Sequence, residues 1–182
     1  MLVRLLRRPV TWVALAVLGV GAVLGLYWFQ PWKLVTDRTV SESLSVPAPT
    51  TGAPVVAAPS PDGPTAAPTV VASGTFVTHE HDTTGDARVV RAADGSHTLE
   101  LVGLDTSNGP DLRVWLTDQP VVDGVPGWRV FDDGQWLELG RLKGNRGDQA
   151  YAIPAGVDPG DFRSVSIWCK RFAVSFGAAP LA

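Results

Sequence analysis

One uncharged apolar run near the N-terminus limits what this chain can fold into more than any other feature of its sequence. Residues 10–29 contain no Asp, Glu, Lys or Arg. About 20 such residues are needed for a helix to cross the roughly 30 Å hydrocarbon layer of a membrane. A secretory signal peptide has a shorter apolar core and a small-residue cleavage site. The run therefore predicts a transmembrane signal anchor over residues 10–29, through which the chain associates with a membrane.

The flanks of this run predict its orientation. Arg4, Arg7 and Arg8 precede it, and the aromatic sequence YWFQPW ends it. Cytoplasmic flanks carry an excess of Lys and Arg, and Trp and Tyr gather at membrane interfaces. We therefore expect residues 1–9 to form the basic cytoplasmic N-terminus of a single-pass cell-membrane protein whose C-terminal part is extracytoplasmic. Cleavage near Gln30 is the alternative.

A proline-rich segment separates this anchor from the rest of the chain. Between Ser41 and Ser73 proline occurs seven times, with Ala, Thr and Ser between the prolines. Such a composition cannot bury enough apolar surface to offset the entropy lost on ordering. We predict an extended, partly polyproline II linker over residues 30–73, which holds the following domain away from the bilayer.

From residue 74 onward the sequence has the short alternating patterns of β-strands. The stretch DLRVWLTD alternates apolar and other residues, and ARVVRAADGSHTLELVGL holds two such patterns around Asp94 and Gly95. An Asp-Gly pair between two alternating runs is a strong hairpin signal, because glycine tolerates positive φ. We predict an all-β domain over residues 74–182, an antiparallel β-sandwich of about 7–9 strands.

Composition excludes several classes of function. The net charge of −3 gives no sign of the basic stripe of a nucleic-acid binder. A single cysteine excludes an intramolecular disulfide and any multi-cysteine zinc or iron–sulfur site. His79, His81 and His97 do not form a recognisable ligand set, so no metal site is assigned. The sequence contains no catalytic triad order and no glycine-rich phosphate loop, and we do not expect a turnover enzyme.

The one cysteine, Cys169, lies in the strand-like stretch RSVSIWCKRFAVSFG. Alternation places Val165, Ile167 and Cys169 on one face of this strand. After Arg171 the apolar positions shift by one residue, which is typical of a β-bulge. Such a bulge would bring Arg171 to the side of the thiol and favour the thiolate. The alternative is a small apolar residue in the core, since free cysteine is among the most buried residue types.

Four blocks of the domain, taken in order, resemble the DM-thirteen domain: GTFVTHEHDTTGDARVV, LELVGLDTSNGPDLRVWL, LELGRLKGNRGDQAYAIP and SVSIWCKRFAVSFGAAPL. The resemblance covers about residues 73–181 and none of the anchor or linker. It implies an extracellular β-sandwich of the kind found near DOMON domains and associated with electron transfer. It also implies that the signature cysteine of the family is Cys169 and that its histidine is His81. The implied role of the cysteine is redox, as a naked thiol or as an axial ligand of a prosthetic group such as haem.

Two functional hypotheses follow. The first is a membrane-anchored extracytoplasmic electron-transfer or thiol-redox module. Cys169 is its redox centre and Arg171 stabilises the thiolate. His81 would be a ligand or proton donor and Trp168 part of the wall of a cofactor site, for which haem is a candidate. The partner would be an extracytoplasmic redox protein or a surface protein.

The second hypothesis is a non-catalytic cell-surface adhesion or assembly module in which the cysteine is part of the core. The insert QPVVDGVPGWRVFDDGQW is longer and more aromatic than the usual loop of the family. We expect this insert either to cover the cysteine or to present Trp128, Phe131 and Trp136 to a partner. The composition, rich in Ala, Val, Gly and Arg, favours an actinobacterial source.

Overall fold

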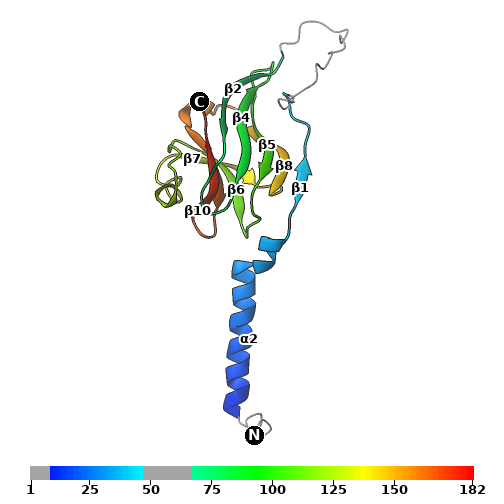
Figure 1. Ribbon diagram of the computed structural model, residues 1–182, viewed down its shortest axis with the longest axis vertical. Helices are drawn as coiled ribbons and strands as arrows, with labels where there is room; N and C mark the ends of the chain where they lie inside the picture. The colour runs from blue at the N-terminus through cyan, green and yellow to red at the C-terminus, as the bar shows by residue number, and fades with distance from the viewer. Residues whose placement is uncertain (1–8, 47–66) are drawn as a thin grey trace.

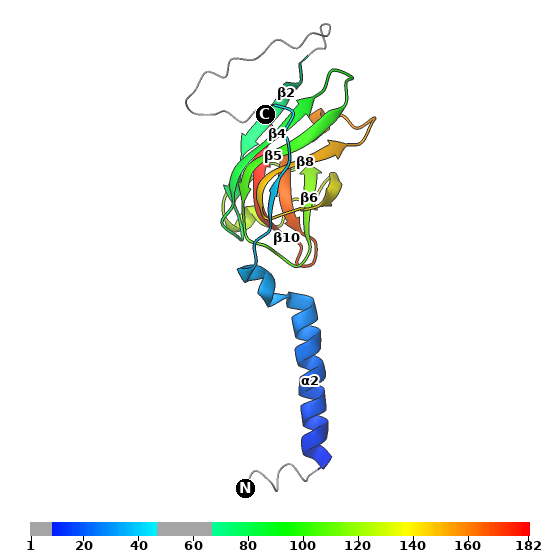
Figure 2. The same ribbon diagram turned by 90° about the vertical axis from the view of Figure 1, so that its right-hand side faces the viewer.

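The computed structural model describes residues 9–46 and 67–182 of the chain. Figures 1 and 2 show one helix that projects from a β-sandwich, with the C-terminus at the opposite end of the sandwich. Residues 1–8 of the expected cytoplasmic N-terminus, and residues 47–66 of the linker predicted over residues 30–73, lie outside the described residues.

Helix α2 (Pro9–Phe29) matches the predicted anchor. It has 21 residues, so it is about 31 Å long at 1.5 Å per residue. Every residue of the helix is at least partly exposed, as expected of a candidate membrane-spanning helix. Among the described residues it is the one helix long and apolar enough to cross a membrane. A 3₁₀ helix, η1 (Pro31–Val35), follows it directly.

The sandwich consists of two five-stranded sheets, which confirms the predicted all-β fold. The first sheet has the order β1 (Thr39–Ser41), β8 (Arg146–Ile153), β5 (His97–Asp105), β4 (Thr84–Arg91) and β2 (Thr69–Thr75). The second has the order β3 (Val77–Thr78), β10 (Val174–Pro180), β9 (Ser164–Cys169), β6 (Leu112–Thr117) and β7 (Trp136–Arg141). Two further 3₁₀ turns, η2 (Val125–Gly127) and η3 (Pro159–Asp161), lie in the connections.

Both ends of the interval assigned to the linker form strands of the first sheet. β1 pairs in parallel with β8, and β2 pairs antiparallel with β4. β1 approaches β8 so closely that a Cβ on Gly147 would lie 2.0 Å from the carbonyl oxygen of Val40. Gly147 also has φ +94, a conformation that glycine adopts readily. After α2 and η1 the chain therefore runs along the edge of the sandwich as β1, before the proline-rich segment begins.

The predicted alternation along β9 is confirmed. Val165, Ile167 and Cys169 belong to the main core cluster between the sheets. Trp168 belongs to a second cluster, together with Phe131 of the insert. The insert therefore covers the face of the second sheet opposite to the cysteine.

The expected aromatic binding surface on the insert is not formed. Phe131 is 0 % exposed, and Trp128 is partly buried against the main core. Trp136 alone of the three is substantially exposed, at 42 %. Phe131 packs against Trp168 and is therefore not available to a partner.

The β-bulge expected directly after the cysteine is not formed there, because residues 163–177 form a hairpin; the register shift lies in β10, between Ser175 and Gly177. β9 ends at Cys169, residues 170–173 form a turn, and β10 returns antiparallel to β9. The apolar positions shift after Arg171 because the chain reverses direction there. The turn sequence KRFA has none of the Gly, Pro, Asn or Asp residues that usually mark turns, and Ala173 adopts φ 49.

Candidate functional site

Cys169 lies at the end of a central strand, on the side of the sandwich that faces α2. It pairs with Leu112 of β6 on one side and with Val174 of β10 on the other. Its side chain is 0 % exposed. The turn that follows it contacts the end of α2, since the rings of Phe172 and Phe29 stack at 5.7 Å. The cysteine is thus buried in the β-sandwich, which we call the head, at the end that faces α2.

The thiol has a partly polar surrounding in spite of its burial. Burial raises the pKa of Cys169, while the backbone N–H groups of Phe172, Asp111 and Arg171 act in the opposite direction. Burial is the larger influence, so the neutral thiol is the resting form. A nucleophilic cysteine needs a thiolate and access for its reagent. The closed structure provides neither.

The guanidinium of Arg171 is directed to the anchor and not to the thiol. It donates to the carbonyl oxygens of Tyr27 at 3.0 Å and Trp28 at 2.6 Å. It also lies over both aromatic rings, at 5.8 and 5.4 Å from their centroids. A cation at the carbonyl end of a helix is favourable. Arg171 therefore fastens the turn after Cys169 to the last turn of α2.

His81 lines a small cavity between the head and the anchor. Its ring lies against Phe176 with centroids 3.9 Å apart, and its Nε2 is 4.0 Å from a carboxylate oxygen of Glu80. The cavity has a volume of about 230 Å³ and is also lined by Phe29 and Phe172. Ligand pockets are commonly about 300–1,000 Å³.

These dimensions do not fit a haem ligated by Cys169. An axial ligand must present its sulfur to the ring, whereas Cys169 is 0 % exposed within the core. His81 faces the cavity of about 230 Å³, which is below the usual range for a drug-sized ligand.

The three histidines are directed to different places. His79 is buried, with Nδ1 2.9 Å from Ser175 Oγ and Nε2 3.2 Å from the carbonyl oxygen of Val122. His97 begins β5 in the other sheet. Within the two described ranges, no three His, Cys, Asp or Glu side chains are grouped as a metal site requires. His79 instead fastens the insert to β10.

Stability is expected to fall as the pH drops below about 6.5, the usual pKa of histidine, because of His79. Burial lowers the pKa of His79, with smaller opposing effects of the hydrogen bond to the Val122 carbonyl and of the charge of Asp123. The unfolded chain therefore binds a proton before the folded chain does, and stability is lost as pH falls from the unfolded toward the folded pKa. We expect His79→Gln to flatten this dependence in thermal unfolding between pH 7 and 5, and His97→Gln to leave it unchanged. An unaltered pH dependence in His79→Gln would contradict this assignment.

Three stacked indole rings cross the outer face of the second sheet. Trp136 and Trp115 have centroids 4.0 Å apart and planes inclined by 4°. Trp115 and Trp168 follow at 5.0 Å and 25°. Trp136 is 42 % exposed, whereas Trp115 and Trp168 are buried. The stack therefore leads from the surface to the residue that directly precedes Cys169.

Sequence reasoning named Trp168 and Trp136 but missed Trp115. The alternation in LRVWLT places Trp115 on the same face as Arg113, opposite to the core residues of β6. From this alternation alone, Trp115 would be expected to lie exposed on the outer face of the sheet. The indole is instead 3 % exposed, and its Nε1 donates to Glu138 at 3.3 Å.

Comparison with known proteins identifies the family of the chain. A family model described as electron transfer DM13 matches residues 75–181, which is more than half of the chain and nearly the whole sandwich. No curated protein and no solved structure matches the chain. The match includes Cys169, His81 and the three stacked tryptophans, and it leaves out α2 and β1. The chain therefore belongs to the electron-transfer DM13 family.

Proposed function

We propose that the chain is a membrane-anchored electron-transfer module with an extracytoplasmic head, and that Cys169 is its redox centre. Family membership supports electron transfer, and α2 supports anchoring in a membrane. The observation that carries the choice of centre is the stack from exposed Trp136 through Trp115 to Trp168, the chain neighbour of Cys169.

Burial of the sulfur favours electron exchange over group transfer. Sulfenate and mixed-disulfide chemistry require a reagent to touch the sulfur, and the side chain of Cys169 is 0 % exposed. An electron can cross packed aromatic rings without such contact. In this proposal the thiol gives one electron, through the stack, to a one-electron acceptor protein, and its proton passes to water. A reduced one-electron donor protein then returns one electron and water returns one proton, so that the thiyl radical becomes the thiol again.

The acceptor would dock where the stack reaches the surface. Trp136 is the exposed ring, and Glu138 and Lys170 beside it form an ion pair at 3.1 Å. An acceptor of this kind is a haem or copper protein with an exposed cofactor edge. His81 and Arg171 then act at the anchor side of the head, where they shape and fasten the turn after Cys169.

The test is one-electron oxidation of the full chain in detergent with hexachloroiridate(IV), followed by stopped-flow absorbance and by mass spectrometry of the oxidised residue. We expect oxidation at Cys169 in the wild type. Trp115→Phe removes the middle indole, and we expect it to slow oxidation of Cys169 by about tenfold or more, a barrier increase of about 1.4 kcal/mol or more.

Trp32→Phe is the matched control, because Trp32 lies in η1, outside the stack. Its oxidation rate at Cys169 should equal that of the wild type. Equal rates in wild type and Trp115→Phe, with the fold intact by circular dichroism, would eliminate the stack as the route.

A further inference from the structure

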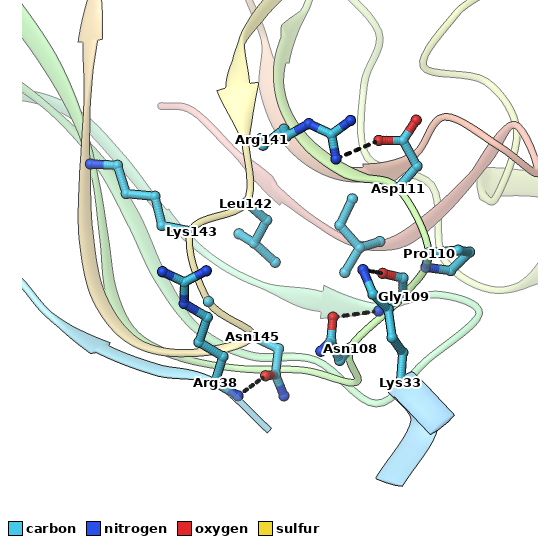
Figure 3. Close-up of a pocket in the computed structure, with 12 residues that line it drawn as sticks. Lys33, Arg38, Asn108, Gly109, Pro110, Asp111, Arg141, Leu142, Lys143 and Asn145 are labelled. Carbon is cyan, nitrogen blue, oxygen red and sulfur yellow. Dashed lines mark hydrogen bonds and ion pairs between the residues drawn. The ribbon is translucent and has the colours of Figure 1, made fainter. Parts of the chain in front are cut away.

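A cavity of about 300 Å³ lies between the segment that follows the anchor and the loops of the head. Lys33 and Arg38 line it from the anchor side, and Arg141, Lys143 and Asp111 line it from the head. Figure 3 shows Lys33 and Arg38 on opposite sides of the opening, with the ammonium of Lys143 pointing away from it. Four cations and one carboxylate therefore surround this space.

Two of these charges are already engaged. Lys143 Nζ donates to both carboxylate oxygens of Glu42 at 2.8 Å and to the carbonyl oxygen of Ala150 at 2.7 Å. The Asp111 carboxylate is 2.8 Å from Arg113 and 3.5 Å from Arg141. Lys143 is thus neutralised by a partner, and Asp111 is shared by two guanidinium groups.

Of the remaining cations, Arg141 shares Asp111, whereas Arg38 and Lys33 form no ion pair with the described residues. The guanidinium of Arg38 has no hydrogen-bond or ion-pair partner among the described residues. The neighbouring carboxylate of Asp37 pairs instead with Arg146, at 3.1 Å. Lys33 Nζ donates to the carbonyl oxygen of Gly109 at 3.0 Å, which leaves two of its three donors.

The pKa of Lys33 also indicates an excess of positive charge around the cavity. Burial lowers the pKa of Lys33, and the charges of Arg141 and Arg171 lower it further. Asp111 has only a smaller opposing effect. The neighbourhood of Lys33 is therefore positive overall, and an anion placed there would relieve the repulsion.

The position of the cavity along the membrane normal indicates where the anion comes from. Lys33 follows Phe29, the last residue of α2, by four residues. At about 2 Å per residue in a 3₁₀ helix, Lys33 lies within about 8 Å of the end of α2. The headgroup layer of each leaflet is about 5–8 Å thick. Lipid phosphates are therefore within reach of this cavity.

We infer that this cavity is a phosphate-binding site that holds the headgroup of an anionic phospholipid. A guanidinium presents paired N–H donors that match phosphate oxygens, and Arg38 supplies them opposite Lys33. Binding there would fix the head on the membrane surface. The inference rests on the proposed membrane anchoring; a free phosphate-bearing molecule would use the same donors.

The test uses the full chain in lipid nanodiscs that contain equal amounts of phosphatidylglycerol and phosphatidylcholine. The lipids that stay bound after transfer to neutral detergent are counted by native mass spectrometry. We expect the wild type to retain phosphatidylglycerol preferentially. Arg38→Gln and Lys33→Gln should each weaken that retention about fivefold, the contribution of one cation near a lipid surface.

The matched control is Arg91→Gln, because Arg91 ends β4 at the far end of the sandwich and should leave lipid retention unchanged. Equal retention in wild type and in the Lys33→Gln/Arg38→Gln double variant would overturn the site. Titration with inorganic phosphate separates the sources. Phosphate binding that depends on Arg38, without any preference for phosphatidylglycerol, would keep the anion site and overturn the lipid as its ligand.

A separate experiment tests whether α2 is inserted in the membrane. Extraction of membranes with alkaline carbonate reports whether α2 is embedded, and Arg38→Gln should not change that result. A chain released by carbonate would overturn the anchoring and with it the lipid headgroup as ligand, while phosphate binding in solution would still decide whether the cavity is an anion site.

Discussion

Cys169 in the folded chain will react with iodoacetamide at pH 8 at least about a thousandfold more slowly than in the unfolded chain, because native domains keep the unfolded fraction near 10⁻³ or below. The sulfur is 0 % exposed and lies on a central strand that is paired on both sides. Burial also raises the pKa of the thiol. Reaction therefore requires opening of the sheet. The rate follows from mass spectrometry of the alkylated chain in native buffer and in denaturant.

A second thiol in the same molecule provides the control. Ser96 is exposed in the turn between β4 and β5, so Ser96→Cys adds an accessible thiol that should react at the rate of a free cysteine. If Cys169 reacts as fast as this added thiol, the sulfur is open to reagents. The redox proposal would then move from electron exchange through Trp168 to sulfenate or mixed-disulfide chemistry at an exposed thiol.

Local patterns in the sequence were enough to predict the anchor and the faces of β9. An uncharged run of apolar residues has few structural solutions, and α2 begins within one residue of the predicted start. Alternation placed Cys169 on one face of β9 and Trp168 on the other, and the two residues belong to two different clusters. The hairpin around Gly95 also followed from sequence, since β4 and β5 pair across it.

What the sequence did not predict depends on contacts between distant segments. β1 has only three residues, too few for an alternation, and it forms because β8 offers an edge. The stack of Trp136 on Trp115 depends on the register between β6 and β7, which contains an irregularity between Val114 and Trp115. The contact of Arg171 with the end of α2 is likewise a tertiary contact. The candidate site is assembled from such contacts, so the sequence identified Cys169, His81, Trp168 and Trp136 but neither Trp115 nor the contact of Arg171 with α2.

Glu100→Ala is expected to lower the free energy of unfolding by about 3–5 kcal/mol, the usual cost of leaving a buried charge without its partner. Glu100 is 0 % exposed, and its Oε2 accepts from the Nε of Arg88 at 2.8 Å. Glu100 also accepts from the backbone N–H of Ser45, and Arg88 donates to the carbonyl oxygen of Val46. Urea unfolding of the full chain in detergent, followed by tryptophan fluorescence, measures the loss.

The double variant Arg88→Met/Glu100→Leu separates the two roles of this pair. Replacing a buried ion pair by apolar residues of similar size is often neutral or stabilising, so its stability should be close to that of the wild type. The backbone of Ser45 and Val46 nevertheless loses both side-chain partners, and proteolysis of the segment after β1 should become faster in both variants. A Glu100→Ala loss below about 1 kcal/mol would mean that water reaches the pair. Unchanged proteolysis in the stable double variant would mean that β1 alone holds the chain between anchor and head.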